Sequence, residues 1–395
     1  MKSYWQRLVG LFFTGWLLIY ANRLVLSASM KAIQEEWHLS KTALGLMTSA
    51  FFVTYSAMQV PAGYLGDRFS RKLVLAAGYF IHALGAILSG LATNPHLFVL
   101  VRALTGLGQG TYYSNEYAIA GAEIPDRHRA AGMAVINSGM SAGIIIGLLA
   151  GGFGSTQGGT SWRVPFVVLG VATLGLAVLM WLVIRGEPAK EQHEGDSSDP
   201  TDGGLDFKGS MACYGLAFIS MYGFYLLLTW LPFYLQESRG FSPAPGALTC
   251  SIVPLLSIPF SVYGGLLSDR IGSRRRILIV LLPVSAVCFF LISLPQNAWL
   301  ILGLVLYGVT GKLVVDPLIV AYMADAVPKS RYATAFGVLN FASALGTVAS
   351  PAITGRMADL FGNFTAAFYL AMALQVLAWG FAWLLPEVGR SRGQA

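Results

Sequence analysis

The sequence is poor in charged residues. Asp, Glu, Lys and Arg make up only 11% of its 395 residues, whereas soluble domains carry about 25%. Hydrophobic residues make up 55% and the mean hydropathy is +0.62, so too little charge is left to keep the surface of a folded chain in water. This composition excludes a cytosolic enzyme and a disordered chain, and it predicts a polytopic membrane protein.

Cysteine and histidine are also scarce. Cys213, Cys250 and Cys288 lie far apart, which gives neither a metal-binding spacing nor a disulfide framework. The five histidines are scattered, and the sequence has no nucleotide-binding loop or zinc motif. The net charge of +7 comes from short basic segments between apolar runs, not from a continuous basic face. We therefore expect no catalysis, no cofactor or metal, and no nucleic-acid partner.

Long apolar runs divide the chain into membrane spans. A helix that crosses about 30 Å of hydrocarbon needs ~20 apolar residues. We predict twelve such spans, over residues 8–31, 43–65, 73–92, 97–120, 131–153, 164–185, 208–236, 245–267, 277–294, 298–324, 333–355 and 364–385.

The basic residues indicate the sidedness of these spans. If both termini are cytoplasmic, 18 of the 26 Lys and Arg residues fall in inner segments, five in outer segments and three within spans. Cytoplasmic segments of membrane proteins carry the excess of positive charge. We therefore expect a multi-pass protein of the inner (plasma) membrane with both ends inside.

Similar sequence motifs occur at corresponding places in the two halves of the chain. Gly-Tyr-Leu-Gly-Asp-Arg-Phe-Ser-Arg-Lys (63–72) follows the second span, and Gly-Leu-Leu-Ser-Asp-Arg-Ile-Gly-Ser-Arg-Arg (265–275) follows the eighth. Corresponding residues are separated by 202 or 203 positions. These pairs are Asp67 and Asp269, Pro125 and Pro328, and Asn137 and Asn340.

This duplication predicts an all-α membrane fold of two pseudo-symmetric six-helix bundles. The N-terminal bundle would cover residues 1–185, a cytoplasmic linker 186–207, and the C-terminal bundle 208–395. In transporters of this plan the substrate binds near the bilayer midplane, between the repeats.

The chain resembles the major facilitator superfamily of secondary transporters along its whole length. Segment 63–72 is close to the superfamily signature, with Ser70 in place of its second glycine. Within the superfamily, segments 22–27, 102–110 and 124–132 resemble the anion:cation symporter family of organic-anion carriers. The resemblance implies a transporter that works by alternating access, and we expect a monomer.

Three basic residues lie inside predicted spans: Arg23, Arg102 and Lys312. A cation at the centre of a membrane helix costs on the order of 3 kcal/mol and should face a wet cavity or a partner. Arg23 and Lys312 lie too deep to reach the interface, whereas Arg102 lies near the outer mouth, where it would face the cavity or snorkel. Three cations converging on a cavity predict an anionic substrate, because guanidinium groups bind carboxylates bidentately.

Polar residues near these cations extend the candidate site. Arg102, Gln109 and Glu116 are seven residues apart and so share one helix face; Gln109 is the repeat counterpart of Lys312. Asp316 follows Lys312 by one helical turn, in position for an ion pair. We expect a proton or Na⁺ to couple transport by neutralising Glu116 or Asp316, although Asp316 would alternatively only neutralise Lys312.

The family resemblance also assigns roles, and the sequence departs from them in two places. It implies that Arg23 and Arg102 bind substrate. Asn22 stands where members often have Asp, and Gln109 where they often have Glu. Those carboxylates are usually assigned to proton coupling, so the coupling scheme of the family does not carry over unchanged.

The signature loop suggests a gate. By resemblance, charge pairs of Asp67, Arg68 and Arg71 hold the two bundles together on the inner side, and we extend this role to Asp269 and Arg270. The alternative is that the basic residues of the loop serve only as topology signals.

Further cavity candidates are aromatic or polar: Tyr20, Tyr112, Tyr113, Asn115 and Tyr225.

A regular spacing of glycines indicates how two helices pack. Gly139, Gly143, Gly147 and Gly151 recur at four-residue spacing and predict a seam along which two helices approach closely.

The leading hypothesis is uptake of a small organic anion, a carboxylate or sugar acid, by proton- or Na⁺-coupled symport across the lipid bilayer. Three alternatives remain. Proton-driven efflux of a drug or siderophore and uniport are alternatives within transport, and a non-transporting receptor or assembly factor is one outside it. The fifth span lacks the Gly-Pro element typical of drug–proton antiporters in the superfamily, which counts against efflux.

Overall fold

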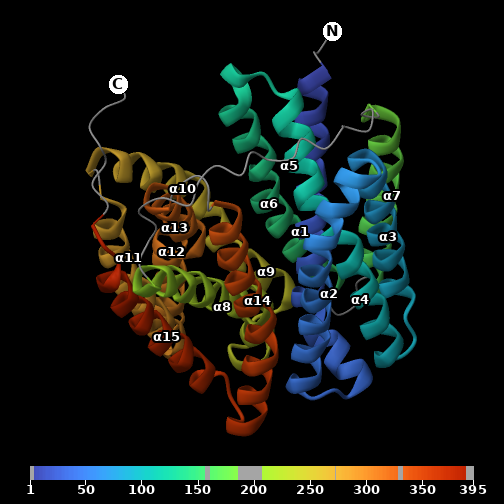
Figure 1. Ribbon diagram of the computed structural model, residues 1–395. Helices are drawn as coiled ribbons and strands as arrows, with labels where there is room; N and C mark the ends of the chain where they lie inside the picture. Colours follow the sequence, from blue (N-terminus) through green and yellow to red (C-terminus); the bar gives the residue numbers. More distant parts are fainter. Residues whose placement is uncertain (1–3, 156–160, 186–206, 272, 328–331, 388–395) are drawn as a thin grey trace. The chain divides into compact units, whose positions relative to one another are not determined.

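The computed structural model describes residues 4–155, 161–185, 207–271, 273–327 and 332–387 (Figure 1). In these ranges all regular structure is α-helical. The predicted linker lies outside them except for residue 207. The helices are α1 (Tyr4–Trp37), α2 (Lys41–Arg68), α3 (Arg71–Leu91), α4 (Pro95–Gly110), α5 (Tyr112–Glu123), α6 (Asp126–Gly154), α7 (Arg163–Val183), α8 (Phe207–Ser238), α9 (Pro243–Cys250), α10 (Ile252–Ile271), α11 (Arg274–Ser293), α12 (Asn297–Thr310), α13 (Lys312–Ala326), α14 (Tyr332–Phe361) and α15 (Thr365–Leu384).

Eleven helical segments of the described chain are long and apolar enough to cross a membrane. The predicted span 97–120 is not among them, because it is divided at Thr111 into α4 and α5, of 16 and 12 residues. Two other predicted spans are also interrupted, 245–267 at Ser251 and 298–324 at Gly311. The sequence prediction of continuous helices missed these three breaks.

Serine residues cap corresponding helices in the two halves. The Ser70 hydroxyl accepts a hydrogen bond from the backbone N–H of Leu73 at the start of α3, and the Ser273 hydroxyl accepts one from Arg276 at the start of α11. The caps are 203 positions apart, which adds a fourth landmark to the repeat. The serine that replaces glycine in the signature segment therefore stabilises a helix start.

The chain divides into two compact units. One comprises the described residues of Met1–Glu194 and Leu231–Ser251, and the other those of Gly195–Trp230 and Ile252–Ala395. Segment 231–251, which the sequence assigns to the C-terminal bundle, thus belongs to the first unit. Its contacts there include an ion pair between Lys41 Nζ and Glu237 Oε1 at 3.1 Å.

The glycine seam is confirmed. α6 lies along α1 (Figure 1), and a Cβ atom at Gly139, Gly143 or Gly147 would collide with a backbone carbonyl oxygen of α1. In the other unit a Cβ atom at Gly346 of α14 would collide with the carbonyl oxygen of Phe218 in α8. Gly346 lies 203 positions after Gly143, so the close helix contact is part of the repeat.

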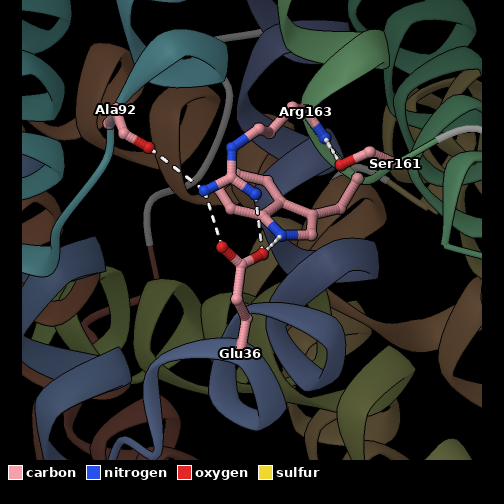
Figure 2. A network of polar contacts seen from close by, with 5 residues as sticks. Glu36, Ala92, Ser161 and Arg163 are labelled. Atoms are coloured by element: carbon pink, nitrogen blue, oxygen red, sulfur yellow. Dashed lines mark hydrogen bonds and ion pairs between the residues drawn. The ribbon is translucent and has the colours of Figure 1, made fainter.

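An ion pair between Glu36 and Arg163 connects the end of α1 to the start of α7 (Figure 2). The Arg163 guanidinium donates to both carboxylate oxygens of Glu36, at 2.6 and 2.7 Å, and to the carbonyl oxygen of Ala92 at 3.2 Å. The indole N–H of Trp162 donates to the same carboxylate at 2.7 Å. Such bidentate pairs fix geometry as well as adding energy, so α1, α3 and α7 are joined at this end of the unit.

Candidate functional site

A polar chain crosses the first unit from α1 through α4 to α3. Arg23 Nε donates to Oε1 of Gln109 at 2.7 Å, and Nε2 of Gln109 lies 3.0 Å from Nε2 of His82. All three side chains are buried, and that of Arg23 is only 6% exposed. The chain brings together two predicted site residues, Arg23 and Gln109. It also adds His82, which sequence reasoning did not select.

Aromatic rings surround the Arg23 guanidinium. Its central carbon lies 4.4 Å from the ring centroid of Tyr55 and 4.9 Å from that of Tyr20, with Phe51 and Phe52 within 6 Å. A desolvated cation against aromatic faces is stabilised by about 2 kcal/mol. The predicted candidate Tyr20 therefore contacts Arg23 directly, and α2 supplies the remaining rings.

Arg102 is buried close to Arg23. It is 1% exposed, its guanidinium lies 4.8 Å from the Phe51 centroid, and it donates a long hydrogen bond of 3.5 Å to the carbonyl oxygen of Asn22. Burial and these contacts place the Arg102 side chain inside the unit, and its exposure to a cavity stays a prediction. Among the described residues no carboxylate forms an ion pair with Arg102. Two guanidinium groups thus share the Phe51 ring in the interior of one unit.

The seven-residue pattern places its three members against α1. Arg102 contacts Asn22 and Gln109 contacts Arg23, as described above. Glu116 Oε2 accepts a hydrogen bond of 3.3 Å from the indole N–H of Trp16. The Glu116 carboxyl is buried, and its Oε1 has no hydrogen-bond partner among the described residues. The shared face predicted for these residues persists across the helix break at Thr111.

The second unit contains a separate charged pair. Lys312 Nζ lies 2.9 Å from Oδ2 of Asp316, so the pair expected from four-residue spacing is present on α13. Oδ1 of Asp316 accepts from the Ser220 hydroxyl at 3.2 Å, and Lys312 Nζ lies 5.2 Å from the Phe224 centroid. The Lys312 and Asp316 side chains are 13% and 27% exposed, so neither is fully enclosed by the second unit.

The aromatic candidates differ in their surroundings. Tyr112 is fully buried, and its hydroxyl donates to the carbonyl oxygen of Phe12 at 3.1 Å. Tyr225 is buried beside Phe224, whereas Tyr113 is exposed. Asn115 donates to the carbonyl oxygens of residues 62 and 111. The Tyr112 hydroxyl and the Asn115 amide nitrogen thus bind backbone carbonyl oxygens, which is typical of residues that pack helices together.

The signature loop forms a local ion pair. Arg71 Nη2 lies 2.8 Å from Oδ1 of Asp67, and Arg68 donates to the Tyr64 hydroxyl at 3.1 Å. Asp67 and Arg71 thus form a charge pair within the loop, and its role as a gate stays a prediction. In the second half Arg270 is exposed at the end of α10, and the side chain of Asp269 lies outside what the structure describes.

His82 and the rings of α2 were missed for different reasons. A single histidine in an apolar run carries no spacing signal, and only the fold brings α3 beside Gln109. Phe51, Phe52 and Tyr55 follow no polar motif, and their role depends on the α2–α4 packing. The signal that could have found His82 is its depth, because a titratable side chain within a span is a functional candidate by default.

A helical membrane protein with buried, closely spaced cations has the make-up of a carrier for charged solutes. The family model of the Major Facilitator Superfamily matches residues 11–311 and again 213–395. The chain belongs to this superfamily and is a multi-pass membrane transporter of the plasma membrane, not an enzyme.

Several curated relatives are named for the transport of acids. The hexuronate transporter of Bacillus subtilis is 27% identical over 392 residues, covering 93% of this chain and 91% of its own. The probable sulfoacetate transporter of Cupriavidus necator is 24% identical, covering 93% and 90%, and the probable galactarate/D-glucarate transporter of B. subtilis is 26% identical, covering 91% and 87%.

A solved structure shows the same fold. The bacterial homologue of the human lysosomal transporter Spinster, crystallised in an inward-facing and occupied conformation, matches with a TM-score of 0.82 and 18% identity over 98% of this chain and 97% of that one. At this identity the likeness supports the fold alone.

Proposed function

We propose that the protein carries a small organic anion, a carboxylate or sugar acid, into the cell by alternating access, as a monomer with both termini cytoplasmic. The observation that carries this proposal is the buried pair of guanidinium groups, Arg23 and Arg102, on the Phe51 ring. Relatives named for hexuronate, glucarate and sulfoacetate support an acidic substrate.

Arg23 is the primary ligand of the substrate carboxylate in this proposal. A neutral amide, Gln109, holds its Nε, so a carboxylate that arrives at the guanidinium does not displace an ion pair at that atom. Tyr20 lies against the same group and would line the site. Lys312 provides the cation of the second bundle, and Arg102 sets the positive potential of the first.

The coupling ion is a proton or Na⁺. Glu116 and Asp316 are the acids available for it within the predicted spans, because Asn22 and Gln109 replace the family carboxylates. Glu116 is buried with one oxygen bound to Trp16, and Asp316 is paired with Lys312. Asp67, Arg68, Arg71, Asp269 and Arg270 form the inner gate in this scheme.

Uptake by purified protein in proteoliposomes tests the substrate site. We expect Arg23→Ala to abolish uptake of labelled D-glucuronate and D-glucarate, with normal protein yield and a monodisperse elution profile. Arg356→Ala is the matched control, because Arg356 is exposed on α14. Uptake by the Arg23→Ala variant at the wild-type rate would contradict the proposal.

Uniport is the second candidate, favoured by the neutral side chains of Asn22 and Gln109. An imposed pH gradient separates the modes. A proton symporter accumulates substrate above equilibrium and a uniporter only equilibrates it. If Glu116 carries the proton, Glu116→Gln equilibrates substrate without accumulation, and Asp316→Asn gives the same comparison for the second acid.

A further inference from the structure

The hydrogen bonds between Arg23, Gln109 and His82 can run in only one direction. An arginine nitrogen is a donor only, so the amide oxygen of Gln109 must face Arg23, as it does at 2.7 Å. The amide nitrogen, also a donor only, then faces Nε2 of His82 at 3.0 Å. Nε2 must therefore accept, which makes His82 a neutral imidazole with its proton on Nδ1.

The surroundings of His82 hold it in that form. The side chain is fully buried, and Nδ1 has no hydrogen-bond partner among the described residues. Two charged side chains lie at the same site and both are positive: Arg23 from α1, which binds Gln109, and Arg102 from α4, which shares the Phe51 ring with Arg23. The Tyr79 ring on α3 lies 5.3 Å away and gives its hydroxyl hydrogen to the carbonyl oxygen of Gly15. A proton on His82 would be the third positive charge at this site.

We infer that His82 is a proton-binding positioning residue that couples protonation to the freeing of Arg23 for the substrate. The inference rests on the proposed function. A bound carboxylate offsets the two guanidinium charges, and a proton can then add to the Nε2 lone pair of His82. Protonated Nε2 is a donor and no longer accepts from the Gln109 amide nitrogen.

The amide must then rotate. After a half turn Oε1 of Gln109 accepts from His82, and the amide nitrogen faces Arg23, which breaks the bond between Arg23 Nε and Oε1. Arg23 Nε–H is left to donate to the substrate carboxylate. Loss of the proton from Nε2 on the inner side reverses the rotation, re-forms the Arg23–Gln109 bond and weakens the hold on the substrate. One proton thus travels with one anion.

Gln109 suits this device because its two ends differ. An amide offers one acceptor and one donor group, so its orientation depends on the protonation of His82. Both oxygens of a carboxylate accept hydrogen bonds, so a carboxylate would accept from Arg23 and from His82 in either orientation. Its orientation would not depend on the protonation of His82. The neutral residue at this position, a departure from the family pattern, is accounted for by a histidine that takes over the proton.

The test compares His82→Gln with the wild type in proteoliposomes. A glutamine side chain can accept from Gln109 but does not bind a proton. We expect the variant to exchange labelled D-glucuronate across the membrane at equilibrium, while accumulation driven by an inward proton gradient falls to a ratio of about 1, since proton and substrate binding are no longer linked. Affinity for D-glucuronate should rise as pH falls in the wild type and stay level in the variant.

His96→Gln is the matched control, because His96 is exposed near the start of α4. Accumulation by His82→Gln at the wild-type ratio would overturn the inference, because the proton would then bind elsewhere. Loss of equilibrium exchange in a monodisperse variant would overturn it too, by making His82 a requirement for substrate passage. Absence of exchange in the wild type with D-glucuronate and D-glucarate would instead refute the proposed function, on which the inference depends.

Discussion

Arg23 and Gln109 are joined by a hydrogen bond of 2.7 Å between Nε and Oε1, from α1 to α4. In a protein interior such a bond to a charged group contributes about 1.5–3 kcal/mol. Because the partner is neutral, the positive charge of Arg23 is oriented but not cancelled by it.

Gln109→Glu converts the amide into a titrating competitor of the substrate. At high pH the carboxylate pairs with Arg23 and repels an anion, and at low pH the protonated acid resembles glutamine. The affinity for D-glucuronate should fall with rising pH in both proteins. We expect the fall in the variant to be about tenfold larger than in the wild type, which corresponds to about 1.4 kcal/mol. Thermal-shift titrations at several pH values measure this, with the exposed Gln296→Glu as control. An unchanged pH dependence would remove Arg23 from the site.

The contribution of the Lys312–Asp316 ion pair to stability can be separated from the role of Lys312 in transport. Lys312→Met leaves the Asp316 carboxylate with the Ser220 hydroxyl as its partner among the described residues, and we expect a loss of about 1–3 kcal/mol in the free energy of unfolding. The double variant Lys312→Met/Asp316→Leu removes both charges and should recover that stability but not uptake. Wild-type uptake by the double variant would mean that Lys312 only neutralises its neighbour.

Gly143 is required by the contact between α6 and α1. Its Cβ in Gly143→Ala would meet the carbonyl oxygen of Leu17, and overpacking of this kind costs about 1–3 kcal/mol. Gly175→Ala on α7 is the control, because a Cβ there meets nothing within 4 Å and alanine favours the helix by about 1 kcal/mol. Thermal unfolding in detergent should separate the two; equal melting temperatures would refute the close contact.

The Glu36–Arg163 pair should stabilise the end of the first unit only modestly. Both side chains are partly exposed, so solvent screens the charges and we expect Glu36→Gln to lower the free energy of unfolding by about 1 kcal/mol. High salt should reduce the difference. The neighbouring exposed Glu35→Gln is the control. If both variants unfold at the same temperature, the bidentate geometry contributes nothing measurable.

Part of the site could be predicted because helical periodicity is local. The spacing of Arg102, Gln109 and Glu116 fixes a common face, and the spacing of Lys312 and Asp316 fixes an ion pair. The breaks at Thr111, Ser251 and Gly311 could not be predicted in the same way, because each lies inside a segment of spanning length and tertiary packing sets where each helix ends.

The sequence by itself determined the class of the protein: apolar runs of spanning length, basic segments between them and a repeat of 202 to 203 residues define a duplicated helical transporter. The tertiary structure alone decided which partners the buried cations have. His82 reaches Gln109, and Phe51 lies under two arginines, because helices distant in sequence pack together. The physical reason is that burial forces polar atoms to find partners, and the available partners are set by helix packing.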